Sequence, residues 1–444
     1  MRLSSADPMR WCRAAGTALI DLDVKVLLRT LVCMVMLAVA AMATAAERIP
    51  LQPLIDAAAP NDLLLLEPGV YAGPVVVDLP ITIDGQGAAT IDAGGEGTVV
   101  LLDTDGAQLR NLRLTNSGGS HNDIDSGVQV RGNFNIIKDN VIDDTLFGVD
   151  LQQSNNNIVR RNTISSKDRE LGLRGDAVRL WYSFDNKITD NKISDSRDTV
   201  VWYSADNTIS GNEATRSRYA LHFMYSRRNV VDGNRYFNNS VGIFLMYSDG
   251  VEVINNTIAH AVGATGTGIG FKETSDVTIA NNRILYCATG LYLDVSPFQP
   301  DATNRIHDNL IGYNGIGIRF LNDWKGNIFR RNRMKGNVTQ VAVNGGGGAT
   351  RNVWEGNYWE DYEGFDRDDD GIGDAPYELY AYADRLWMDV PAAQFFTGSP
   401  TLEVLDFLER LAPFSEPDLL LRDKRPLMAA ERADDERRQR QTEE

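Results

Sequence analysis

The sequence predicts an all-β protein, a right-handed parallel β-helix of about a dozen coils with an N-terminal capping helix and a short helical C-terminal extension. From residue 135 on, a motif recurs in which Asn or a small polar residue is followed by an apolar residue and then by a second Asn. Each run between these motifs is a short alternating strand broken by Asn, Gly or Asp. A leucine-rich repeat would need a Leu ladder and a helical segment in each unit.

The spacing of the motif sets the length of one coil. Successive second asparagines are 21 to 29 residues apart, with an average of about 24. Asparagine tolerates left-handed backbone at corners, and stacked amides can bond each other. We therefore expect structural asparagine ladders, and assign the β-helix to residues 63–360. The second Asn stands at positions 140, 162, 191, 212, 234, 256, 282, 309, 332 and 357.

A further strand lies between the Asn pairs and alternates between apolar and other residues. One alternate set should point inward and stack along the core, while the other faces solvent and is the place to look for function. The predicted inward residues are Val149, Leu151, Val178, Leu180, Leu221, Phe223, Ile243, Leu245, Leu291, Leu293, Ile318 and Phe320.

The N-terminal residues 1–45 read as a secretory signal peptide. A positive flank with Lys25 and Arg29 precedes the apolar run 31–42, which is followed by Ala-Thr-Ala at 43–45. That run is short of the roughly 20 residues that span a bilayer. We expect cleavage near Ala46 and export to the periplasm.

Both ends of the array need covering, because open sheet edges recruit other strands. Residues 46–62 are expected to form an N-terminal cap containing a short helix. After the array, residues 361–400 form an Asp-rich loop and terminal extension. Residues 401–428 contain an amphipathic helix and should serve as a cap or as a docking segment. The charged tail 429–444 is expected to be disordered.

Several segments of the mature chain resemble the NosD family, within the right-handed β-helix proteins of CASH type. The Asp-rich loop with its GNYW sequence recurs in other secreted β-helix proteins, whereas the paired MYS coils and the LAPF to RPL tail are more specific. The segments are LHFMYS at 221–226, FLMYS at 244–248, GNYW at 356–359, DRDDDGIGD at 366–374, LERLAPF at 408–414 and RPL at 425–427.

The resemblance implies a non-catalytic periplasmic accessory protein that takes part in assembling the copper site of nitrous oxide reductase. It implies the membrane subunit of an ABC transporter and the reductase itself as partners, and it leaves room for a copper-donating lipoprotein. None of this follows from the periodicity of the sequence.

Aligned coils place two methionines and two tryptophans at one outward position. Met224 and Met246 should lie side by side, because adjacent coils are about 4.8 Å apart, and His222 points to the same face. Thioether and imidazole ligands suit Cu(I), which we expect to bind transiently. The alternative is an apolar stripe covered by a loop or a partner. The column is Trp181, Trp202, Met224 and Met246, and a second ladder at the corner is Tyr182, Tyr203, Tyr225 and Tyr247.

The Asp-rich loop matches part of an EF-hand calcium loop. Asp366, Asp368, Asp370 and Asp374 take positions 1, 3, 5 and 9 of the loop, where carboxylates converge on the ion. The closing bidentate Glu is missing, since position 12 is Tyr377. The loop is therefore expected to hold structural Ca²⁺ weakly or to be a solvated acidic turn.

Charge and composition exclude some functions and leave others open. With 61 acidic against 44 basic residues, a net charge of -17 and no concentrated basic stripe, the chain should repel nucleic acid. A polysaccharide lyase, hydrolase or epimerase is a competing hypothesis, because Arg179 and Lys272 face outward. The predicted outward rows hold no neighbouring carboxylates for hydrolysis. A passive surface-binding protein is the third possibility.

Overall fold

The structure is a computed structural model that describes residues 48–382, 384–396, 399–412 and 417–429. The chain divides into two units, residues 1–49 and residues 50–444. Of the first unit only Arg48 and Ile49 are described, so the predicted signal peptide lies outside the described residues. Everything below concerns the second unit.

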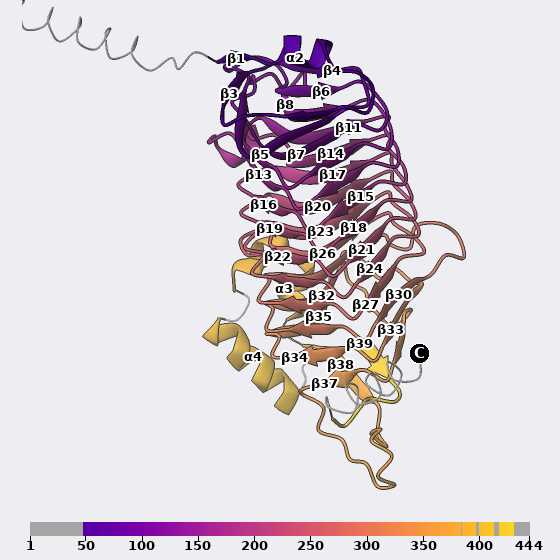
Figure 1. The fold of residues 1–444 in the computed structure, drawn as a ribbon. Helices are drawn as coiled ribbons and strands as arrows, with labels where there is room; N and C mark the ends of the chain where they lie inside the picture. Colours follow the sequence, from indigo (N-terminus) through magenta and orange to yellow (C-terminus); the bar gives the residue numbers. More distant parts are fainter. Residues whose placement is uncertain (1–47, 383, 397–398, 413–416, 430–444) are drawn as a thin grey trace, which may run out of the picture. The chain divides into compact units, whose positions relative to one another are not determined.

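The second unit is a parallel β-helix, as predicted. Figure 1 shows its strands stacked coil upon coil, from those next to α2 to those next to β39. The smaller of its two large sheets has 12 strands, which agrees with the expected number of coils. Those strands are β4 (Val75–Val77), β6 (Val100–Leu102), β8 (Ser126–Val130), β11 (Phe147–Gln152), β14 (Val178–Trp181), β17 (Asp198–Trp202), β20 (Tyr219–Met224), β23 (Val241–Met246), β26 (Thr267–Lys272), β29 (Thr289–Asp294), β32 (Ile316–Phe320) and β35 (Thr339–Val343).

The larger sheet has 25 strands and holds the segments on either side of the Asn motifs. They are β1 (Ile49–Pro50), β2 (Leu63–Leu65), β3 (Gly69–Ala72), β5 (Thr82–Asp92), β7 (Gln108–Thr115), β9 (Ile136–Lys138), β10 (Val141–Thr145), β12 (Ile158–Arg160), β13 (Thr163–Ser166), β15 (Lys187–Thr189), β16 (Lys192–Ser194), β18 (Thr208–Ser210), β19 (Glu213–Thr215), β21 (Val230–Asp232), β22 (Arg235–Phe237), β24 (Glu252–Ile254), β25 (Thr257–Ala259), β27 (Thr278–Ala280), β28 (Arg283–Leu285), β30 (Asn304–His307), β31 (Leu310–Gly312), β33 (Asn327–Arg330), β34 (Arg333–Lys335), β36 (Val353–Glu355) and β37 (Tyr358–Trp359).

The predicted inward residues form the core of the β-helix. Every one of them is buried, and the pairs Leu221/Phe223 and Ile243/Leu245 have no exposed surface. Burying an apolar side chain of this size stabilises the fold by about 1.5 to 3 kcal/mol relative to leaving it exposed. Since these positions are filled, the residues between them on each strand must face outward.

The second asparagines form an unbroken ladder, as predicted. The backbone N–H of Asn140 donates to Oδ1 of Asn162 at 3.1 Å, and the side-chain amide of Asn140 donates to the same oxygen at 3.0 Å. The ladder continues coil by coil to Asn332, whose backbone N–H donates to Oδ1 of Asn357 at 3.0 Å. These buried polar groups are therefore satisfied by each other rather than by water.

The C-terminal end of the ladder is closed by a strand that the sequence did not predict. Strand β39 (Asp418–Asp423) pairs antiparallel with β38 (Tyr377–Ala381). Fully buried Asp423 ends the ladder, because its Oδ2 accepts from the backbone N–H of Asn357 at 2.9 Å, from the Asn357 side-chain amide at 2.9 Å and from Nε1 of Trp359 at 3.2 Å. Its Oδ1 accepts from the backbone N–H groups of Gly356 and Arg425, each at 3.1 Å.

The RPL segment belongs to this C-terminal cap. The backbone N–H of Leu427 donates to Asn357 O at 3.0 Å, and that of Gly373 donates to Pro426 O at 2.8 Å. Met428 N–H likewise donates to Gly371 O at 3.0 Å. The segment thus fastens the Asp-rich loop to the last coil.

The helices are short and lie mainly at the ends of the β-helix. At the N-terminal end, the short helix α2 (Gln52–Asp56) lies within the predicted cap at residues 46–62. Ile55 in this helix and Leu51 just before it are fully buried. The others are η1 (Leu171–Leu173), α3 (Arg385–Asp389), η2 (Pro391–Phe396) and α4 (Pro400–Leu411). Among the described residues, no helix is long and apolar enough to cross a membrane.

Helix α4 begins where predicted and leaves its apolar face uncovered. The Ser399 hydroxyl caps it by accepting from the Leu402 backbone N–H at 3.3 Å, and Leu402 is buried. The remaining large apolar residues lie at helical spacing and stay exposed. These residues are Val404, Leu405, Phe407, Leu408 and Leu411.

Candidate functional site

The outward column predicted from the aligned coils is present. In strands β14, β17, β20 and β23 the register pairs Trp181 with Trp202, Trp202 with Met224, and Met224 with Met246. The next partner in the column is Lys272. The two methionines are half-buried rather than fully exposed, so the surrounding side chains already shelter their thioethers.

His222 lies beside this column and contacts one of its methionines. Its Nε2 is 3.4 Å from Sδ of Met246. The two side chains could therefore both contribute a ligand to one soft metal ion such as Cu(I). Met224 is the register partner of Met246 on the neighbouring strand. The structure therefore brings two of the predicted copper ligands, His222 and Met246, into contact and places the third, Met224, on the strand position next to Met246.

The imidazole of His222 is held by an aromatic and ionic stack. The Tyr219 ring stacks on it with centroids 4.7 Å apart, and the Arg218 guanidinium lies 5.1 Å from the Tyr219 centroid. Arg218 in turn pairs with the buried carboxylate of Asp198. Burial lowers the pKa of His222, against the opposite effect of the Asp198 charge. The imidazole is thus kept neutral, which is the form that binds metals.

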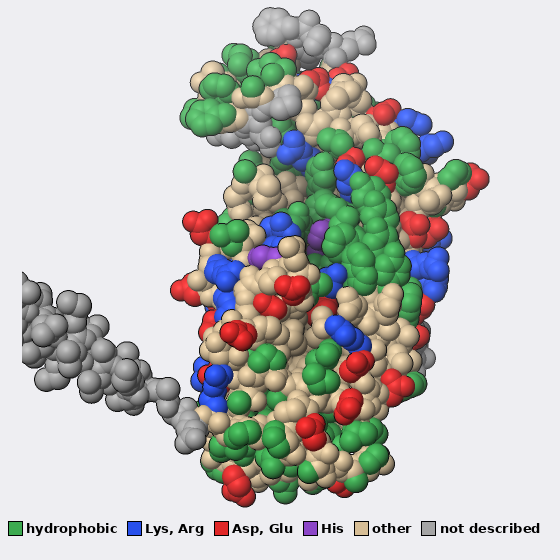
Figure 2. Space-filling view, turned by 90° about the horizontal axis from the view of Figure 1, so that it is seen from above, with side chains coloured by type: hydrophobic (Ala, Val, Ile, Leu, Met, Phe, Trp, Pro, Cys, Tyr) green, Lys and Arg blue, Asp and Glu red, His purple; other side chains and the backbone are tan. Residues whose placement is uncertain are grey.

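The tyrosines form the predicted second ladder next to the column. Tyr182, Tyr203, Tyr225 and Tyr247 stack in that order, with centroids 4.9, 5.1 and 4.8 Å apart and ring planes within 10°. Figure 2 shows a continuous area of hydrophobic side chains with histidine side chains beside it on one face of the molecule. Aromatic surface of this kind is typical of contact surfaces.

Arg179 and Lys272, the two basic residues that made a polysaccharide lyase a competing hypothesis, both contact other side chains. Nη1 of Arg179 lies 2.7 Å from Oδ1 of Asp150, whose side chain is fully buried, and the Arg179 guanidinium lies over the Trp181 ring at 4.9 Å. Burial raises the pKa of Asp150 despite Arg179. The Lys272 ammonium is 5.8 Å from the Tyr247 ring centroid.

Sequence reasoning missed two buried carboxylates on neighbouring coils, Asp176 and Asp198. Asp176 accepts two bonds from Arg197 at 3.0 and 3.1 Å, and Asp198 pairs with Arg218. Burial raises the pKa of Asp176 to about 6, although Arg197 counteracts it. The signal was an Arg that follows each Asp by about one coil, 21 residues after Asp176 and 20 after Asp198. Because each carboxylate is bound by its own Arg, neither is free to act on a substrate.

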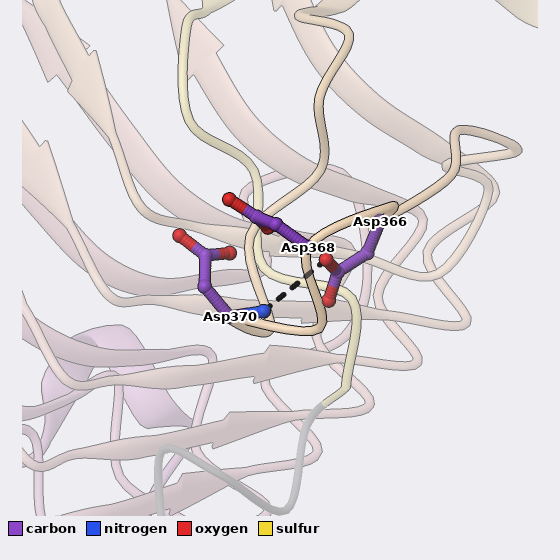
Figure 3. Close-up of side chains that lie close together, drawn as sticks. All are labelled: Asp366, Asp368 and Asp370. Atoms are coloured by element: carbon purple, nitrogen blue, oxygen red, sulfur yellow. Dashed lines mark hydrogen bonds between the residues drawn. The ribbon is translucent and has the colours of Figure 1, made fainter.

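The Asp-rich loop brings together three of its four predicted ligands. Carboxylate oxygens of Asp366, Asp368 and Asp370 lie within 4.8 Å of one another, and Figure 3 shows the three side chains around one turn. Gly371 makes the turn with φ of 84°, and its N–H donates to Asp366 at 2.7 Å. Asp374 lies outside this group and accepts from the Arg367 N–H at 2.9 Å. The charge of Asp370 raises the pKa of Asp368.

A comparison with known protein families covers the part of the chain that carries this face. A family model described as "Periplasmic copper-binding protein (NosD)" matches residues 163–364, which include His222, Met224 and Met246. The chain is therefore similar to the NosD family over this segment. This confirms the resemblance seen in the MYS coils.

Curated relatives extend the NosD likeness beyond the matched segment. A protein from Pseudomonas aeruginosa named "Probable ABC transporter binding protein NosD" is 29% identical over 401 residues, which is 82% of this chain and 87% of the relative. A protein of the same name from Stutzerimonas stutzeri is 27% identical over 403 residues, covering 82% of this chain and 86% of the relative.

Solved structures agree with the fold of this chain. The A-module of the Azotobacter vinelandii mannuronan C-5 epimerase AlgE6 has a TM-score of 0.53 at 18% identity, and covers 66% of this chain and 90% of its own. The AlgE4 A-module has a TM-score of 0.51 at 17% identity, covering 67% and 93%. Likeness at this level concerns the fold alone.

Proposed function

We propose that this chain is a non-catalytic periplasmic accessory protein that binds Cu(I) transiently and helps to assemble the copper site of nitrous oxide reductase, together with an ABC transporter. The observation that carries the proposal is the approach of His222 Nε2 to Met246 Sδ at 3.4 Å, with Met224 alongside. The description of the family as periplasmic and copper-binding, and the name of the relatives, support it.

The three proposed ligands suit a site that passes copper to another protein rather than a site that stores it. Two thioethers and one imidazole can hold Cu(I) and leave a position free for a ligand from another protein. Cys287, the only free cysteine among the described residues, is buried, and burial raises the pKa of its thiol to about 11. A thiol that stays protonated contributes no thiolate ligand, so the proposed copper binding rests on the neutral thioether and imidazole donors.

The charged groups on the outward face support a non-catalytic role. Lyase or epimerase chemistry needs a free base beside the sugar, and hydrolysis needs two available carboxyl groups. Arg179 is bound to buried Asp150, while Asp176 and Asp198 are each bound by an Arg. The likeness to mannuronan epimerases concerns the fold alone.

Helix α4 is the best candidate for contact with the membrane subunit of the transporter. Val404, Phe407, Leu408 and Leu411 lie on one face of the helix and are each between 47% and 67% exposed. The RPL segment, which could also have served in docking, is occupied in the C-terminal cap. The reductase and a copper-donating lipoprotein would then bind on the side of the β-helix, at the face that carries His222, Met224 and Met246.

The affinity for Cu(I) should stay constant to a lower pH than it would with a histidine of ordinary pKa. The imidazole must be neutral to bind, so affinity is present above the folded-state pKa and is lost as the pH falls through it. Because burial lowers the pKa of His222, affinity should stay constant down to about pH 6.5, the usual histidine value, and fall only below it. Anaerobic Cu(I) titration against a chromophoric chelator over a range of pH measures this.

The matched control is His222→Ala, which should bind Cu(I) about tenfold or more weakly and without this pH dependence. A loss of affinity already centred above about pH 6.5 in the unchanged protein would contradict the proposed role of the buried imidazole.

The Asp-rich loop is proposed to hold Ca²⁺ in a structural role. Removal of Ca²⁺ with a chelator should lower the melting temperature by about 2 to 4 °C, because a bound ion stabilises the native state by mass action. The change Asp368→Ala with Asp370→Ala should give the same decrease without the chelator. Glu363→Ala, an exposed acidic residue of the same loop, is the control. A melting temperature that does not respond to the chelator would leave only a solvated acidic turn.

A further inference from the structure

The four tyrosines of the ladder occupy backbone positions at which asparagine or glycine would be less strained. Tyr182, Tyr203, Tyr225 and Tyr247 have φ between 48° and 50°, in the left-handed region that bulky side chains rarely adopt. The ladder of corners beside the asparagines meets the same requirement with residues such as Gly211, Gly233 and Asn255. Asparagine or glycine would satisfy the turn with less strain. The fold therefore requires a residue with left-handed backbone dihedrals at these corners. That requirement does not explain why the residue is tyrosine.

The ladder lies directly beside the proposed copper ligands and along a groove. Each tyrosine immediately follows a residue of the outward column, so Tyr225 follows Met224 and Tyr247 follows Met246. The groove has a volume of about 410 Å³ and runs between the tyrosines and a second row that includes Phe184, Arg227 and Asp249. Tyr182 and Tyr225 are 43% and 47% exposed.

The groove has little net charge although the whole chain carries -17. Its charged lining residues are one Arg and one Asp, Arg227 and Asp249. A partner held there by charge would need complementary charge on this surface, which the lining does not offer. Tyrosine and tryptophan instead supply large, rigid contact area at low conformational cost, as is usual at the centre of protein interfaces.

We infer that the tyrosine ladder is the docking surface for the copper protein that exchanges Cu(I) with His222, Met224 and Met246. The inference rests on the proposed function, because direct exchange requires the ligands of both proteins to reach one ion. The partner must then cover the ligand cluster and contact what surrounds it. Its own surface should be uncharged and apolar around soft Met, Cys or His ligands, and the association should change little with salt.

The test separates docking from metal binding. Tyr203→Asn with Tyr225→Asn removes two central rings but keeps residues that favour left-handed backbone, so the melting temperature should be unchanged or higher. Cu(I) affinity of the purified variant should also be unchanged. The copper content of nitrous oxide reductase from cells with this variant at normal level should fall by about tenfold, as expected for loss of central interface residues.

A second tyrosine ladder provides a matched control. Tyr286 and Tyr313 also have positive φ, stack with centroids 5.3 Å apart and are 47% and 42% exposed, but they lie at a different corner in later coils. Tyr286→Asn with Tyr313→Asn should leave the copper content of the reductase normal. If the central pair does not fold, the outer pair Tyr182→Asn with Tyr247→Asn replaces it.

Three results would overturn the inference. Normal copper loading in the Tyr203/Tyr225 variant would show that the ladder is not needed for exchange. Equal loss in the Tyr286/Tyr313 control would show that the effect is general, and loss of Cu(I) affinity in the Tyr203/Tyr225 variant would place the rings in the metal site itself. Failure of the proposed function is distinct, because the unchanged protein would then bind no Cu(I).

Discussion

Replacing Asp423 by alanine is expected to destabilise the C-terminal coils by about 3 to 5 kcal/mol, because it leaves several buried N–H donors without an acceptor. Asp423 is fully buried and receives bonds from the backbone and side chain of Asn357 and from Nε1 of Trp359, besides two further backbone N–H groups. Each unsatisfied buried donor costs about 1 to 3 kcal/mol, although the site relaxes in part. In a repeat structure the loss should begin at this end and spread to neighbouring coils.

Urea unfolding followed by fluorescence measures this effect, since Trp354 and Trp359 lie in the last coil. Asp418→Ala is the control, because Asp418 is on the same strand with a side chain 64% exposed. Asp423→Asn should be intermediate, because the amide keeps the volume but replaces one acceptor oxygen by a donor. An alanine variant as stable as the Asp418 control would contradict the capping role of Asp423.

The double change Met224→Leu with Met246→Leu is expected to yield nitrous oxide reductase with little copper. Leucine is close to methionine in size and apolarity, so the column on β20 and β23 should pack as before. Only the sulfur is lost, and with it two of the three proposed Cu(I) donors. Loss of such ligands typically reduces metal affinity by about 10-fold to 100-fold or more.

The readout is the copper content of the reductase purified from cells in which the variant replaces the natural chain at equal level. Met428→Leu is the control, since Met428 is half-buried in the C-terminal cap. Full copper loading in the double variant would refute the metal role and leave this face as a contact surface alone.

The sequence predicted the β-helix well because each coil repeats the same local requirements. The second asparagines, such as Asn140 and Asn332, bond only to the coils next to them, so their spacing reveals the ladder. The alignment of coils likewise placed Met224 beside Met246. Periodic contacts between neighbouring coils leave a periodic signal in the chain.

The ends of the molecule were harder to predict because their contacts are not periodic. Asp423 reaches Asn357 across 66 residues of sequence, and no motif links the two. Strand β39 was therefore not predicted within the segment 401–428. The stack of Arg218 and Tyr219 on His222 also depends on side-chain packing within one strand, which residue patterns do not reveal.

The most direct test of the account is anaerobic Cu(I) titration of the purified mature chain beside its Met224→Leu, Met246→Leu variant. The account predicts that the unchanged chain binds Cu(I) at a site that includes these sulfurs, and that the variant melts at the same temperature but binds Cu(I) much more weakly. Absence of Cu(I) binding by the unchanged chain, or equal affinity in the variant, would contradict it.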